Sequence, residues 1–252
     1  MARAGNFAQW LICLEEKRRK VLKDVLQLHK VCKQPYKRRL RANKDWLSRA
    51  RRQGINVNAW LDALAVEETI NGRQVKIAVE SDPFEILLMG TYFQTCLSIG
   101  GSACSSALAN AHDVNKHVIY MRGADGQVIA RQLIGVSQDF RLLGYHCYTN
   151  LPNENDGDVC AAMARYCGRL ARECGLALGD SGAPEELSDL GWYDDGPQEW
   201  PEPDRAAWSA ALPREAMLRR PPGLASLSYL TGAEWHEVDL ANLATPRDCV
   251  GR

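Results

Sequence analysis

The chain has 252 residues, of which 46% are hydrophobic and 25% are charged, and its 31 Lys and Arg residues balance its 31 Asp and Glu residues. This is the composition of an ordinary globular chain that is long enough to bury a sizeable core. No stretch approaches the about 18 apolar residues of a membrane span, and no secretory signal is visible, so the sequence argues against a membrane partner and against secretion.

Charge is distributed unevenly along the chain. Residues 1–53 carry 16 Lys and Arg residues against 4 Asp and Glu residues, whereas residues 151–252 carry 9 against 18. This asymmetry predicts either an anionic partner for the basic end or mutual neutralisation of the two ends within one molecule. The nine cysteines form no C-x-x-C pair, which predicts reduced thiols, no disulfide and a cytoplasmic location.

Residues 1–54 are predicted to form a basic helical segment. Apolar residues recur at helical spacing from Phe7 to Cys32, which predicts a first helix. Pro35 separates it from a second, more basic helix that is expected from Tyr36 to Gln53. Gly54 is well placed to end this second helix.

The second helix carries the candidate nucleic-acid-binding residues. Its apolar stripe is narrow, so most of its cations are expected to point away from the core, where they could contact phosphates. Tyr36 and Trp46 could stack on a ligand or pack against the protein. The alternative is a solvated helical hairpin that docks on the acidic half of the chain. The candidate contacts are Lys37, Arg38, Arg41, Lys44, Arg49 and Arg52.

Residues 55–180 are predicted to form an α+β core domain. A short helix is expected near residues 58–65. Asn71-Gly72 is the signal of a type I′ hairpin turn, and the residues from Val75 to Val79 alternate as in a strand.

Two short helices are expected after this strand. Asp82 and Glu85 form a capping box that starts the first helix, and Gly90 is expected to end it in the left-handed conformation. Ser102 is expected to cap a second helix of small residues, from Ala103 to Ala111.

Three strands and a long helix complete the predicted core domain. The strands are expected over residues 118–122, 127–136 and 142–148, and their short connections imply antiparallel neighbours. A helix from Asp158 to Cys174 follows, with an apolar face that we expect to pack on the sheet. This face consists of Val159, Met163, Tyr166, Cys167, Leu170 and Cys174.

Residues 181–252 are predicted to form an irregular, Pro-rich acidic arm that wraps on the body, with a helix possible from Asp204 to Leu212. The run from Trp192 to Gly196, W-Y-D-D-G, is typical of a docking motif. The predicted fold class is therefore α+β. It comprises basic N-terminal helices, a small antiparallel sheet of about four strands with helices on one side, and the acidic arm.

Cys96, Cys104 and His146 are the candidate catalytic residues. Cys104 is expected in the first turn of a helix, where free amides and the helix dipole lower the pKa of a thiol. A cysteine at a helix start followed by a histidine on a strand is the chain order of papain-like and transglutaminase-like sites. The alternative is that both cysteines are small buried core residues.

Two further groups of polar residues could form binding sites. His112, Asp113 and His117 lie within six residues of one another, but no zinc spacing accompanies them, so we expect neither a metal ion nor another cofactor. Arg122 and Arg131 are expected on facing strands, where they could form a fork for a carboxylate or a phosphate. The alternative is that both arginines simply face solvent.

The runs G-T-Y-F-Q-T-C-L and V-I-Y-M-R-G-A-D-G-Q-V-I-A-R-Q-L-I resemble a region of PcfJ-like bacterial proteins, over about residues 88–150. In that family, a segment that contains Gly and Cys precedes a strand–turn–strand of this kind. This chain departs from the family in having Gln94-Thr95-Cys96 where the family has a His-Cys pair. The function of the family is poorly defined, so the resemblance implies a local fold and no particular activity.

These observations favour a non-enzymatic binding or interaction module. We expect its basic N-terminal helices to contact DNA, RNA or another anionic partner, which includes a protein. The alternative is a cysteine-dependent hydrolase or transferase that uses Cys96 or Cys104 with His146. An open basic face would favour binding, whereas a Cys–His pair lining a pocket would favour the enzyme.

Overall fold

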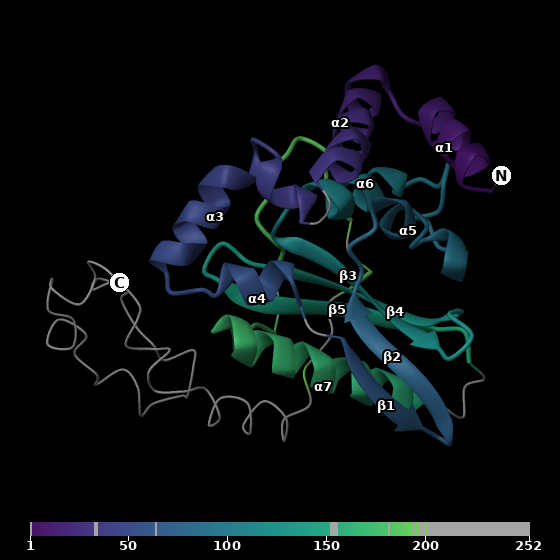
Figure 1. Cartoon of the computed structure of the whole chain (residues 1–252), viewed down its shortest axis with the longest axis vertical. Helices are drawn as coiled ribbons and strands as arrows, with labels where there is room; N and C mark the ends of the chain where they lie inside the picture. The colour runs from purple at the N-terminus through teal and green to yellow at the C-terminus, as the bar shows by residue number, and fades with distance from the viewer. Residues whose placement is uncertain are drawn as a thin grey trace, which may run out of the picture.

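The described part of this computed structural model comprises residues 2–32, 35–63, 65–151, 156–180, 182–193, 195, 196 and 200 (Figure 1). It contains seven α-helices, two short 3-10 helices and one sheet, so the predicted α+β class is confirmed. The helices are α1 (Ala2–Cys13), α2 (Glu16–Cys32), η1 (Tyr36–Arg39), α3 (Asn43–Arg52), α4 (Val57–Leu61), α5 (Pro83–Leu87), η2 (Thr91–Phe93), α6 (Cys104–His112) and α7 (Asp156–Cys174). The strands are β1 (Val66–Ile70), β2 (Arg73–Val79), β3 (Lys116–Gly123), β4 (Val128–Val136), β5 (Arg141–Thr149) and β6 (Ala177–Leu178).

The sheet is larger than predicted. Its six strands lie in chain order, and each neighbouring pair is antiparallel except β5 and β6, which run parallel. The prediction of about four antiparallel strands is therefore wrong in strand number and in the last pairing. Periodicity does not reveal β1, because three polar residues interrupt its apolar pattern, and the two residues of β6 are too few to show a period.

Helices cover both faces of the sheet, whereas the sequence predicted helices on one side. The helices α3, α4 and α7 contribute to the core on one face, which includes Trp46, Trp60 and Ile119. The helices α1, α2, α5 and α6 contribute to the core on the other face, with Trp10 and Val118. The adjacent residues Val118 and Ile119 are both buried, so β3 is apolar on both faces and needs cover on each. In Figure 1, α7 lies below the sheet, and α5 and α6 lie above it.

The predicted apolar face of α7 is confirmed. The Cys174 carbonyl at the end of the helix accepts a hydrogen bond from the Asn56 amide, at the start of α4, at 2.9 Å. The helix is thereby fixed to α4 as well as to the sheet. The face residues that lie in the core are Val159, Met163, Tyr166, Cys167, Leu170 and Cys174.

Two of the predicted local signals are confirmed. Asn71 and Gly72, with φ angles of 50° and 75°, form the turn between β1 and β2. The Asp82 carboxylate accepts a hydrogen bond from the Phe84 amide at 2.9 Å, and Pro83 is the first residue of α5. These signals locate the hairpin and the start of α5 correctly.

Two other local predictions are wrong. Gly90 has a φ of −75°, so it is not a left-handed helix stop, and α5 already ends at Leu87. A Cβ on Gly90 would lie 2.1 Å from the Leu97 backbone, so this glycine permits two chain segments to meet. The N-cap of α6 is Ala103, without a side-chain cap, rather than Ser102.

Both predicted front helices are interrupted. The first is divided into α1 and α2 at Leu14, whose carbonyl accepts a hydrogen bond from Arg19 Nε at 2.6 Å. The second is divided into η1 and α3. Because Trp10 and Trp46 lie in the two cores, the front helices pack with the sheet, and a domain boundary at residue 54 stays a prediction. Within the described ranges, no helix combines the length and the apolar character needed to cross a lipid bilayer.

The first part of the predicted arm follows the β5 strand and then crosses to the opposite core. The Gly196 carbonyl accepts a hydrogen bond from the His146 amide of β5 at 2.9 Å. Trp200 packs in the core that contains α7, and a Cβ on Gly144 would lie 2.6 Å from its ring. Residues 201–252, which include the helix expected from Asp204 to Leu212, lie outside the described residues.

Candidate functional site

The solvent face of α3 is strongly basic. Lys44, Arg51 and Arg52 of α3 are exposed, and so is Arg41, two residues before the helix begins; Lys44 and Arg51, seven positions apart, share a face. The exposed Asp45, seven positions before Arg52, is the one acidic residue of α3. The opposite side is buried in the core. Among the described residues, no carboxylate forms an ion pair with any of these four side chains. We call these four residues the α3 basic face.

Lys37 does not belong to this face, although it was predicted to contact nucleic acid. It is only 4% exposed, and its Nζ donates hydrogen bonds to the carbonyls of Asn110 (2.6 Å), Asp113 (3.2 Å) and Lys116 (2.8 Å). Burial lowers the pKa of Lys37 to about 7; the charge of Lys116 acts in the same direction, and that of Asp113 opposes it. The hydrogen bonds of the Lys37 ammonium group therefore join η1 to the end of α6 and the loop after it. This group is not available to a ligand at the surface.

Arg38 and Arg49 are occupied by carboxylates of the same chain. Arg38 lies 3.4 Å from Asp62, and Arg49 lies 2.6 Å from Glu185 of the arm. The Arg49–Glu185 pair is an instance of the predicted neutralisation of the basic end by the acidic end. Of the six candidate contacts, Arg41, Lys44 and Arg52 remain exposed, and Arg51 joins them.

The two aromatic residues of the predicted second helix, Tyr36 and Trp46, pack inside the protein. Tyr36 and Trp46 are each about 1% exposed, and the Tyr36 hydroxyl donates a hydrogen bond to the Ala111 carbonyl at 2.6 Å. Of the two roles considered for these rings, packing is therefore correct and stacking on a ligand is not. The α3 basic face can therefore contact a ligand through its charges, but not by stacking on Tyr36 or Trp46.

Cys104 lies in the first turn of α6, as expected, but its thiol is not activated there. Burial raises its pKa, although a backbone hydrogen bond with Gly100 and the charge of Arg18 act to lower it. The prediction of a lowered thiol pKa at this helix start is therefore wrong, because desolvation outweighs the helix terminus.

Cys96 is half-buried in the tight loop between Gly90 and Gly101. A Cβ on Gly101 would lie 2.3 Å from the Cys96 carbonyl oxygen, which shows how closely the loop is closed. Gln94 within the loop has a φ of 51°, a left-handed conformation that is uncommon for residues other than glycine. The loop therefore fixes the backbone on both sides of Cys96.

His146 is exposed on β5 and is not joined to either candidate thiol by a hydrogen bond among the described residues. Its ring packs edge-on against Tyr148, with the ring centres 4.7 Å apart. Burial raises the pKa of Tyr148, and the charges of Asp195 and Cys96 raise it further. Tyr148 is therefore in ring contact with His146 and is influenced by the charge of Cys96, but no described hydrogen bond or ring contact joins His146 to either thiol.

The two arginines of the predicted fork are each paired within the chain. Arg122 forms ion pairs with Glu80 and Glu85. Arg131 is completely buried and lies 2.6 Å from Asp195, which belongs to the predicted docking motif. Both arginines therefore bind carboxylates, as the predicted fork was expected to do. The carboxylates belong to this chain and not to a ligand. The expected alternative of two solvent-facing arginines is wrong.

A buried polar cluster follows α6, and it includes His112 and Asp113, two of the three polar residues that the sequence analysis grouped there. Asp113 accepts hydrogen bonds from Lys116 at 2.6 Å and from Ser188 at 2.7 Å, and it contacts His112 at 2.9 Å. These bonds hold the pKa of Asp113 below its usual value, against the effect of burial. The short spacing of Asp113 and Lys116 was visible, but the participation of Ser188 depends on the path of the arm. In the part of the chain that the structure describes, no three His, Cys, Asp or Glu side chains are grouped to hold a metal ion.

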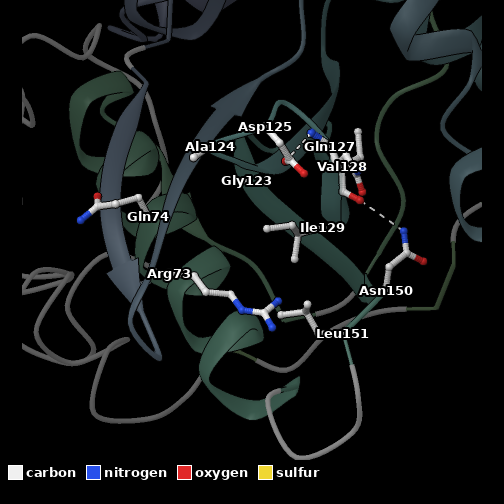
Figure 2. A pocket seen from close by; sticks show the side chains of 10 residues that line it. All are labelled: Arg73, Gln74, Gly123, Ala124, Asp125, Gln127, Val128, Ile129, Asn150 and Leu151. Carbon is white, nitrogen blue, oxygen red and sulfur yellow. Dashed lines mark hydrogen bonds between the residues drawn. The ribbon is translucent and has the colours of Figure 1, made fainter.

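Two hollows flank the turn between β3 and β4, and the sequence analysis had named one residue of their lining, Arg122 of the second hollow, as a candidate binding residue. The first has a volume of about 440 Å³, and Figure 2 shows Arg73 on one side of it and Asp125 and Asn150 on others, around Ile129. The second is a wider groove of about 740 Å³ lined by Glu80, Asp82, Glu85, Tyr92 and Arg122, among others. Arg122 forms ion pairs with Glu80 and Glu85, so a single cation opposes the three carboxylates that line the groove.

No protein-family model, no curated protein and no solved structure matches this chain. The resemblance of residues 88–150 to PcfJ-like bacterial proteins therefore stays a prediction.

Proposed function

We propose that the protein binds nucleic acid through the α3 basic face. The observation that carries this proposal is that the basic side chains between residues 37 and 52 differ in burial and in ion pairing. Lys37, Arg38 and Arg49 are buried or paired within the chain, whereas the four cations of the α3 basic face point into solvent without a described carboxylate partner.

Such a face would recognise the phosphate backbone rather than the bases. Lys and Arg side chains that neutralise phosphates release counterions, and this term is independent of nucleotide sequence. Because Tyr36 and Trp46 are buried, neither of these rings is available to stack on bases beside the α3 basic face. Binding should therefore be weakly sequence-dependent and strongly salt-dependent.

The test is fluorescence-polarisation binding to labelled DNA and RNA over a range of salt concentrations. If all four cations contact phosphates, the logarithm of the association constant should fall with the logarithm of salt concentration with a slope of about −3. Arg41→Glu combined with Lys44→Glu should weaken binding at low salt and reduce that slope by about 1.5 or more.

A matched control places the same charge change elsewhere. Arg73→Glu combined with Lys76→Glu reverses two exposed cations of β2 and should leave binding nearly unchanged. The proposal fails if the wild-type protein shows no binding at low salt, or if the control pair weakens binding as much as the α3 pair.

A second candidate function is thiol chemistry at Cys96. The observations in its favour are that Cys96 is only half-buried in its tightly closed loop, and that the exposed His146 packs against Tyr148, whose pKa the charge of Cys96 raises. If His146 activates the thiol, iodoacetamide should alkylate Cys96 of the native protein near neutral pH, because the thiolate is the nucleophile. Cys104 should react more slowly, since burial raises its pKa.

The control for this second function is His146→Gln, which should slow the alkylation of Cys96 and leave that of Cys104 unchanged. Peptide mapping by mass spectrometry measures the two sites separately. If Cys96 is not labelled, or if the substitution has no effect on its rate, Cys96 is a structural residue.

A further inference from the structure

Arg131 lies in a buried site that a distant part of the chain fills. The residue is central in β4 and has no solvent exposure. Its guanidinium carbon lies 4.5 Å from the centre of the Tyr148 ring and 5.6 Å from that of the Phe93 ring, so the cation is flanked by two aromatic faces. Asp195, 64 residues further along the chain, places its carboxylate 2.6 Å from Nη2.

The donors of this guanidinium are only partly used. Nη1 donates to the Met89 carbonyl at 3.1 Å and Nη2 donates to Asp195, but the buried Nε has no hydrogen-bond partner among the described residues. Arginine binds a carboxylate most specifically through two parallel hydrogen bonds, which Nε and one Nη can supply together. The site therefore has the donors for a bidentate carboxylate, whereas Asp195 bonds to a single described nitrogen.

The residues around Asp195 lie on the protein in the manner of a bound peptide. Trp192 packs against Tyr145, with ring centres 6.0 Å apart, and the Lys116 ammonium lies 5.4 Å from its ring. The Tyr193 amide donates a hydrogen bond to Ser106 Oγ at 2.7 Å. The Gly196 carbonyl accepts one from the main chain of β5 at 2.9 Å. Main-chain pairing with a strand, an aromatic contact and a buried carboxylate are elements by which peptides are recognised.

We propose that this surface is a docking site for an aromatic–acidic peptide segment, which Trp192 to Gly196 fill within the chain and which a partner protein's segment of the same chemistry can fill in their place. We define the Arg131 docking site by Ser106, Lys116, Arg131, Tyr145 and Tyr148. The occupant is identified by the arm itself: an aromatic residue, two intervening positions and a carboxylate.

The contact between Asp195 and Arg131 carries a desolvation cost, which any carboxylate that fills this site has to meet. Burial raises the pKa of Asp195, although the charges of Arg131 and His146 and hydrogen bonds with Arg131 and Tyr148 act to lower it. Desolvation therefore offsets part of the ion pair, as expected for a buried pair whose attraction has to compensate the loss of water. The arm segment is a local occupant at high effective concentration, and an external segment competes with it.

The test measures binding of a fluorescent peptide that copies residues 190–196, Leu-Gly-Trp-Tyr-Asp-Asp-Gly. The protein variant Trp192→Ala/Asp195→Ala removes the two anchors of the arm. This variant should bind the peptide at least about tenfold more tightly than the wild-type protein, in which the site is already filled. A peptide in which the residue equivalent to Asp195 is Asn should lose most of that affinity, because it cannot pair with Arg131 as a charge.

The matched control is Glu185→Ala, which breaks a different ion pair of the arm and leaves Asp195 in place. It should bind the peptide no better than the wild-type protein. If circular dichroism shows that the double variant is unfolded, Asp195→Ala alone is used with the same expectation. Equal binding by the wild-type protein and the variant, or equal binding of the Asp and Asn peptides, would overturn the proposal.

Discussion

Lys37 has a structural role, because its ammonium group donates hydrogen bonds to three backbone carbonyls. The carbonyl of Asn110 is one of the last four of α6, which have no partner within the helix. A cation at this end of a helix also interacts favourably with the helix dipole. The residue therefore serves as a cap that comes from a distant part of the chain, at the cost of burying an ammonium group.

The lowered pKa of Lys37 predicts a pH dependence of stability. Its pKa falls from 10.5 to about 7 on folding, so between these values the unfolded chain binds more protons at this residue than the folded protein does. The free energy of unfolding should then rise with pH across this window. From pH 7 to pH 8.5, the wild-type protein should gain about 1–2 kcal/mol relative to Lys37→Met.

Urea unfolding at both pH values measures this difference. Lys44→Met is the matched control, since Lys44 is exposed on α3 and should show no such change. A constant gap between the wild-type protein and Lys37→Met at the two pH values would mean that Lys37 stays charged when it is buried.

At the scale of elements, α7 is the clearest link between sequence pattern and stability. Leu170 is buried in the core beneath the sheet. Leu170→Ala should lower the free energy of unfolding by about 2–5 kcal/mol, because it removes buried methyl groups and leaves a cavity. The neighbouring exposed substitution Arg169→Ala should cost about 0.5 kcal/mol or less. Chemical denaturation of both variants checks this, and similar values for the two would place α7 at the periphery.

The sequence predicted those elements whose own residues determine them. The hairpin at Asn71-Gly72 follows from left-handed backbone preference, and the start of α5 follows from the cap at Asp82. The three strands of the meander and the apolar face of α7 follow from periodicity. Gly90 shows the opposite case, because its role depends on Leu97, which lies against it only in the folded chain.

The candidate sites were less predictable for the same reason. The sequence indicated which cations exist, but the exposure of Lys44 and the burial of Lys37 depend on contacts made across the fold. The partner of Arg131 lies 64 residues away, and no local pattern joins them. Cys104 was placed correctly at a helix start, yet its pKa follows from the surrounding burial rather than from the helix.

At the scale of the whole molecule, opposite charges of the two ends of the chain meet. Lys17 of α2 pairs with Asp189 at 2.9 Å, and Arg49 of α3 pairs with Glu185 at 2.6 Å. Lys17 and Asp189 are both exposed, so their pair contributes little to stability. The Arg49–Glu185 pair is partly buried and is the better test of whether the front segment depends on the arm.

Arg49→Glu should lower stability without affecting the α3 basic face. The substitution replaces an attraction to Glu185 with a repulsion, which should cost about 1 kcal/mol, or about 2–4 °C in melting temperature. Nucleic-acid affinity should change less than in Arg41→Glu/Lys44→Glu. The charge swap Arg49→Glu/Glu185→Lys should restore the melting temperature. No recovery in the swapped variant would show that the pair does not stabilise the contact.

The position of Trp200 has a consequence for the order of events during synthesis. Its ring rests on Gly144 within the core that contains α7, and its Nε1 donates a hydrogen bond to the Gly179 carbonyl at 2.8 Å. The sheet and all seven described helices precede this residue in the chain. A nascent chain therefore displays every one of these elements before it can close that core, and the apolar surface around Gly144 stays open to chaperones until residue 200 has left the ribosomal tunnel.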